Sequence, residues 1–190
     1  VGEFPELQGI MGGYYSKKNG FDNEFKAALF EQYKPLGHND EIPNSTLGCI
    51  LSLSNNIDAL ISFFSIGLIP SGSRDPFALR RAMNAVIKVL IIKEVGISFP
   101  HLLELAHPKN SPKKSETLEG LKSFFVDRLR TSLLDQNYSV DIINSIIMHD
   151  VIKNNSLYFL INRLKTLTIF SSKKIEKDFI KNYKRIFNIL

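Results

Sequence analysis

Arginine dominates the stretch GSRDPFALRR, residues 72–81, and its side chain is well suited to holding phosphate. The planar guanidinium offers two donors at once to a phosphate or carboxylate group. On a helical wheel Arg80, Arg81 and Lys88 fall on the same side. No acidic residue follows in this helix before Glu94, so ion pairs within the helix cannot neutralise the stripe. The pattern predicts contact with phosphate or with a partner protein.

A second interpretation of these arginines remains open. Isolated charge stripes are commonly solvated surface, or they pair with acids elsewhere in the fold. Arg74, which precedes the helix, carries the same two interpretations.

Three residues of the same stretch predict how its helix begins. Gly72 permits a turn, Asp75 can accept hydrogen bonds as the N-cap, and Pro76 fits the first helical position, where no hydrogen bond is lost. We therefore expect the helix to begin at Asp75 and to end before Gly96. Gly72, Asp75 and Pro76 are assigned to structure.

Another basic surface is expected near the C-terminus. Lys177, Lys181 and Arg185 are interleaved there with Phe179 and Tyr183. An amphipathic basic helix of this kind either lies against an RNA backbone or is an ordinary surface helix. The sequence leaves both interpretations open.

The chain offers few groups for catalysis or metal binding. No serine lies in a nucleophile elbow, and Cys49 lies in an apolar helical pattern in which an inert thiol is expected. His38, His101 and His107 show no metal-ligand spacing, and the pair at 149–150, His-Asp, is interpreted as a coincidence of composition. We predict no catalytic residue, no metal and no cofactor in this chain.

Composition places the chain among globular proteins. Its 190 residues are 44% hydrophobic and 23% charged, with a net charge of +5 and a pI near 9.2, which permits nucleic-acid binding. The single cysteine fits a reducing, cytoplasmic setting. No signal peptide is visible and no stretch reaches the roughly 18 apolar residues of a membrane span. The first residue, Val1, and the helical pattern at the end suggest a piece of a longer protein.

Long segments between widely spaced turn residues predict an all-α fold in two parts. The composition changes at the proline-bearing linker 107–116, so the predicted division is 1–106 and 107–190. The helices are expected at residues 22–33, 44–66, 75–95, 115–134, 140–148, 156–170 and 174–190.

Two long segments match a known family. Residues 3–15 read EFPELQGIMGGYY, and residues 57–82 read IDALISFFSIGLIPSGSRDPFALRRA. Between them, EQYKP at 31–35 fits the same pattern. In this order and separation the segments make the chain resemble the β subunit of the bacterial heterotetrameric glycyl-tRNA synthetase, most strongly over residues 1–95.

The resemblance implies both a fold and a function. Residues 1–106 would form an HD-like helical domain, and 107–190 a helical body region that leads toward an absent C-terminal anticodon-binding domain. In that family the α subunit holds the aminoacylation site and uses ATP, and the β subunit recognises tRNA. The implied partners are tRNA-Gly and the α subunit, in a cytoplasmic α2β2 tetramer with no membrane contact. The charge patterns described above, and not the resemblance, nominate the residues expected to touch tRNA or the α subunit, which are Arg74, Arg80, Arg81, Lys88, Lys177, Lys181 and Arg185.

Two further functions remain as alternatives. The first is an HD-type metal-dependent phosphohydrolase, although Asn55 stands where the family pattern has an aspartate, and an amide is a weaker metal ligand. The second is a scaffold between subunits that does not touch RNA. Asp58 is expected to be an interior carboxylate, either capped or in an ion pair for which the arginines of residues 72–81 are candidate partners, and a direct functional role is the alternative.

Overall fold

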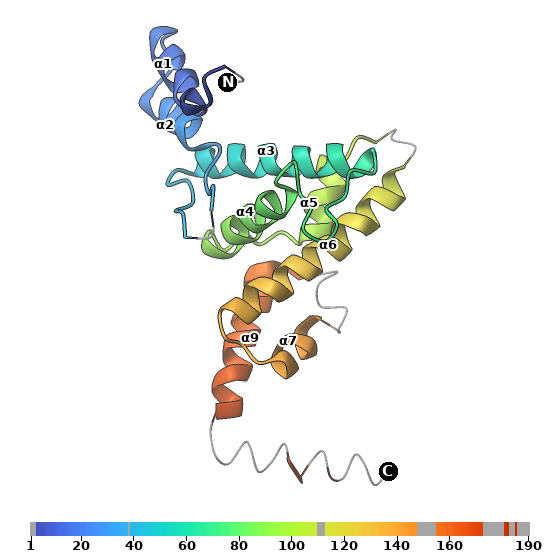
Figure 1. The fold of residues 1–190 in the computed structure, drawn as a ribbon. Helices are drawn as coiled ribbons and strands as arrows, with labels where there is room; N and C mark the ends of the chain where they lie inside the picture. The colour runs from blue at the N-terminus through green and yellow to red at the C-terminus, as the bar shows by residue number, and fades with distance from the viewer. Residues whose placement is uncertain are drawn as a thin grey trace.

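The computed structural model describes residues 3–37, 39–109, 113–147, 155–172, 181–182 and 185. Within them the chain forms eight α-helices and one short 3-10 helix, with no strand, so the all-α prediction is confirmed (Figure 1). The elements are η1 Pro5–Leu7, α1 Met11–Lys18, α2 Asn23–Glu31, α3 Thr46–Ser65, α4 Leu79–Ile92, α5 Phe99–Ala106, α6 Lys114–Asp135, α7 Val140–Ile147 and α9 Leu157–Ser172.

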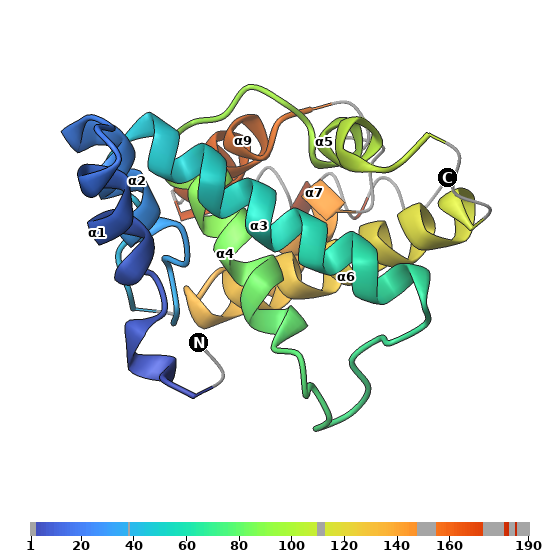
Figure 2. The ribbon, with the colours of Figure 1, turned by 90° about the horizontal axis from the view of Figure 1, so that it is seen from above.

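The helices pack in an order that follows the chain. The pair α1 and α2 lies beyond the beginning of α3, and α4, α5 and α6 lie against the other side of α3 (Figures 1 and 2). The long helix α6 is followed in the chain by α7 and α9. Helix α7 packs against α6 and α9, and α9 also contacts α4. The helix expected at 174–190 falls almost entirely outside the described residues, of which 181, 182 and 185 are helical.

Helix α3 supplies much of the core. The Ser45 hydroxyl caps it by accepting a hydrogen bond from the Gly48 amide at 3.0 Å, next to the predicted start of this helix at residue 44. Ile57, Leu60 and Phe64 are buried against α4 and α6. Among the described helices α3 alone is long and apolar enough to cross a membrane, but core helices of soluble proteins have the same length and composition.

Helix α1 was not predicted from the sequence, because two adjacent glycines weaken the helical signal. Gly12 and Gly13 lower the intrinsic helix propensity of this segment. At Gly13 a Cβ atom would lie 2.6 Å from atoms of the Phe30 ring in α2. Glycine therefore allows α1 and α2 to approach closely, and their packing stabilises a helix that the local sequence disfavours.

Helix α5 is also absent from the prediction, because it is short and contains Pro100. The proline lies in the first turn, where its missing N–H is tolerated. Ser98 caps the helix. The ring of Phe99 stacks on Phe125 of α6 with centroids 4.1 Å apart, and both side chains are buried. This stack joins α5 to α6, and buried Leu103 adds α5 to the common core.

The remaining expected helices are found as α2, α3, α6, α7 and α9, within a few residues of their predicted bounds. One hydrophobic cluster includes buried residues from α3 through α9, such as Leu60, Leu90, Leu129 and Leu164. This cluster has members on both sides of the division at residue 106, and that division stays a prediction.

Candidate functional site

Helix α4 begins three residues later than the sequence predicts. Its N-cap is Ala78, in the left-handed region with φ of +54°, and Pro76 lies in the preceding turn. The predicted start at Asp75 with Pro76 at the first helical position is therefore wrong. The Asp75 carboxylate still caps the helix from outside, since it accepts hydrogen bonds from the amides of Leu79 at 2.8 Å and Arg80 at 2.9 Å.

Replacing Asp75 with alanine is expected to lower the free energy of unfolding by about 1 kcal/mol. Two amides at the start of α4 would lose their acceptor. Asp75→Asn should lower the stability less, because the amide oxygen of asparagine can still accept a hydrogen bond. Urea unfolding measures the difference. Asp127→Ala removes an exposed carboxylate within α6 and is the matched control. A loss at Asp75 no larger than the loss at Asp127 would contradict the capping role.

A tight turn precedes α4 and is held by Arg80. Ser71 and Arg74 exchange two backbone hydrogen bonds, of 3.1 and 2.9 Å, around Gly72, whose φ is +52°. The Arg80 guanidinium donates to the Gly72 carbonyl at 2.7 Å. Arg80 therefore fastens the turn to the helix, a structural contact that the stripe alone does not reveal. Arg74 is exposed on this turn.

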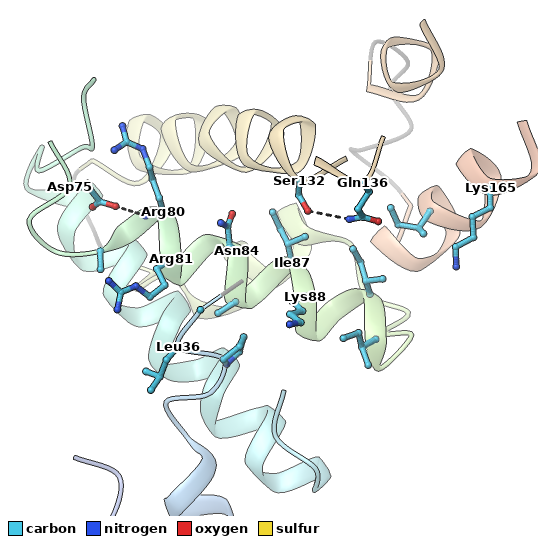
Figure 3. Close-up of a pocket in the computed structure, with 17 residues that line it drawn as sticks. Leu36, Asp75, Arg80, Arg81, Asn84, Ile87, Lys88, Ser132, Gln136 and Lys165 are labelled. Carbon is cyan, nitrogen blue, oxygen red and sulfur yellow. Dashed lines mark hydrogen bonds between the residues drawn. The ribbon is translucent and has the colours of Figure 1, made fainter. Parts of the chain in front are cut away.

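The cationic side of α4 forms one wall of a groove of about 630 Å³ (Figure 3). Arg80, Arg81 and Lys88 all line it, which confirms that they share one side of the helix. The opposite walls come from the loop at residues 35–37, the end of α6 and α9. In Figure 3 the side chains of Arg80 and Arg81 point in different directions.

The cations of the groove differ in how far they are engaged. Lys88 is half-buried, and its ammonium donates a hydrogen bond to the Asp40 carbonyl. The Arg81 side chain is exposed, and within the described residues its guanidinium has neither a hydrogen bond nor an ion pair. Lys165, on α9, is exposed at the other end of the groove. Arg81 and Lys165 are thus the cations most available to a ligand.

The lining residues that sequence reasoning did not find include three polar ones, Ser132, Gln136 and Lys165. They lie far along the chain from α4 and reach the groove only because α6 and α9 pack against that helix. No local pattern around them signals this position.

The expectation for Asp58 is wrong. Asp58 is exposed on α3, and in the described part of the chain it forms no ion pair with any of the three arginines. It lines a separate, shallower hollow between α3 and α5 with Ile50 and Leu105, both largely exposed. Apolar residues occur on more of α3 than the face that is buried. The apolar pattern around Asp58 therefore led to the wrong expectation that its side chain lies in the interior.

The second predicted basic surface is described only in part. Lys181 and Arg185 are helical and exposed. Lys177 and the His149–Asp150 pair lie outside the described residues.

Metal-binding groups do not gather in the described part of the chain, where no set of three or more His, Cys, Asp or Glu side chains is placed to hold an ion. His107 is buried at the end of α5, with its Nδ1 3.0 Å from the Pro108 carbonyl oxygen. The prediction of no metal in the whole chain remains a prediction.

Cys49 is expected to react slowly with thiol reagents in the folded chain. Its side chain is 5% exposed, and its Sγ donates to the Pro43 carbonyl at 3.2 Å. Burial raises the pKa of the thiol, with smaller effects from Lys93, which lowers it, and Glu31, which raises it. Since the thiolate is the nucleophile, iodoacetamide at neutral pH should label native protein about a hundredfold more slowly than urea-unfolded protein. Equal rates would contradict the buried position.

Comparison with known proteins agrees with the resemblance carried by the motifs. The family model described as glycyl-tRNA synthetase beta subunit matches residues 1–148. A glycine–tRNA ligase beta subunit of Thermodesulfovibrio yellowstonii is 40% identical over 190 residues, which is 100% of this chain and 27% of that protein. The corresponding subunit of an Acidovorax species is 36% identical over the same length, with 26% of that protein covered.

A third relative, from Halothermothrix orenii, is 40% identical over 147 residues, covering 77% of this chain and 21% of the relative. The chain thus spans about a quarter of the length of the curated relatives it matches. Since the family model covers well over half of the chain, the chain belongs to the glycyl-tRNA synthetase beta subunit family.

Proposed function

We propose that this chain is the part of a glycine–tRNA ligase β subunit that positions tRNA-Gly while the α subunit performs aminoacylation with ATP. In this proposal the complete enzyme is a cytoplasmic α2β2 tetramer, and the present chain supplies binding groups and no catalytic residue. The names of the relatives support the ligase assignment.

The observation that carries the tRNA-positioning role is the acid-free cationic side of α4. Arg81 is exposed there without a partner in the described residues, and Arg74 is exposed on the adjacent turn. Among the described residues that line the groove, only Asp75 is acidic, and its carboxylate is directed at the helix amides. The local field therefore favours an anion, and phosphates of an RNA backbone are matched to guanidinium groups.

Salt-dependent binding tests this proposal. Titrating the chain and the complete ligase with tRNA-Gly and with an unrelated tRNA should give affinity that falls steeply as salt rises, because phosphate contacts release counterions. The complete ligase should prefer tRNA-Gly. If the chain binds no tRNA at low salt, and the complete ligase shows no salt dependence, the cationic side of α4 serves the fold or a subunit contact instead.

A further inference from the structure

The groove beside α4 has the size and enclosure of a site for a small molecule. Its volume of about 630 Å³ lies in the range of about 300–1,000 Å³ that is typical of such sites. Packed helices close it on two sides, α4 on one and the end of α6 with α9 on the other. A double-helical stem is far too wide to enter, but a single base with its sugar is not.

One wall of the groove is apolar. Ile92 in its lining is largely exposed and Ile91 is half-buried, whereas Ile87 and Ile161, also in the lining, are buried. Leu36 stands at the mouth, largely exposed. A flat base can pack its face on such a surface, since every base has an apolar face regardless of sequence.

The groove also carries neutral polar groups that can pair with the edge of a base. The Asn84 Oδ1 accepts a long hydrogen bond from the Arg128 Nε at 3.4 Å, and within the described residues the Asn84 amide nitrogen has no partner. Gln136 and Ser132 share one long hydrogen bond, also of 3.4 Å, so both can exchange it for a better partner (Figure 3). Amide and hydroxyl groups provide both donors and acceptors.

Cations lie at opposite ends of these walls. Arg81 is exposed at the α4 end and Lys165 at the α9 end. The charge of Asp75 is directed at the amides of Leu79 and Arg80. An apolar surface, neutral pairing groups and cations at both ends together match the three parts of a nucleotide.

We infer that the groove is a subsite for one unpaired nucleotide of an RNA strand. The base lies against the isoleucines, its edge faces Asn84 and Gln136, and the flanking phosphates lie at Arg81 and Lys165. This inference rests on the proposed function, because tRNA supplies the strand. It adds that the contact is made to a nucleotide outside the stems, which phosphate contact alone does not require.

The test uses the complete ligase with a substitution that fills the groove without changing its charge. Ser132→Tyr places a ring where the base would lie. It is expected to weaken the binding of tRNA-Gly about tenfold, which corresponds to the loss of one stacked base. Ser145→Tyr, at an exposed serine of α7 away from the groove, is the control and should leave affinity unchanged.

A second measurement does not depend on how Ser132→Tyr folds. A photo-crosslinking amino acid at the exposed position Gln136 should attach to an unpaired nucleotide of tRNA-Gly, identified by mass spectrometry. Attachment only to stem nucleotides, or to none, would overturn the subsite. If Ser132→Tyr binds normally but Arg81→Glu binds weakly, the subsite is wrong and the proposed function stands. If neither substitution changes tRNA affinity, both fail.

Discussion

Reversing two charges beside α4, with Arg74→Glu and Arg81→Glu together, is expected to weaken the binding of tRNA-Gly by the complete ligase roughly a hundredfold at low salt. Each substitution removes an attraction to phosphate and adds a repulsion, and the effect should shrink as salt screens the charges. The slope of log affinity against log salt should also fall by about one for each phosphate that the enzyme no longer neutralises.

A matched control separates this local effect from the change in net charge. Lys18→Glu with Lys17→Glu reverses two exposed charges on α1, away from the groove. This pair should change affinity several-fold at most. If the α1 pair weakens binding as strongly as the pair Arg74 and Arg81, the chain attracts tRNA through its overall charge, and the cationic surface at the start of α4 has no special role.

Replacing Phe125 with alanine is expected to lower the free energy of unfolding by about 3–5 kcal/mol. The ring is 2% exposed and stacked on Phe99, so its removal leaves a cavity between α5 and α6 and takes away the stack that joins them. Chemical denaturation followed by circular dichroism measures the change. Such a loss is comparable to the whole stability of many domains.

Phe159→Ala is the matched control for this core substitution. Phe159 is on α9, and 52% of it is exposed, so the expected loss is below about 1 kcal/mol. A similar loss at both positions would contradict the buried, stacked position of Phe125.

Local signals predicted most of the helices. Asp22 and Ser45 cap α2 and α3 within one residue of the predicted starts at 22 and 44, because a side-chain oxygen at an N-cap acts within its own turn. α1 and α5 were missed because tertiary contacts outweigh weak propensity: Gly13 packs on Phe30, and the Phe99 ring stacks across to α6. Contacts between residues distant in the sequence cannot be predicted from the local pattern of residues.

The site was predicted on one wall only. Helical periodicity placed Arg80, Arg81 and Lys88 together, since it depends only on spacing along α4. The start of that helix was misplaced because Ala78 adopts a left-handed conformation, which alanine rarely does and which its sequence context does not indicate. The opposite wall, with Ser132 and Lys165, depends on how α6 and α9 pack, and this is a property of the whole fold.

The turn at residues 71–74 has an entropic consequence. Its two backbone hydrogen bonds and the Arg80 guanidinium restrict the segment before any ligand arrives. Ordering the backbone of a loose loop costs about 1–2 kcal/mol per residue, and here folding bears that cost. If Arg74 contacts phosphate as proposed, it does so from a backbone that folding has already ordered. Little of its electrostatic attraction is then offset by lost freedom of the backbone, and a complex made through it should form without a slow rearrangement of the loop.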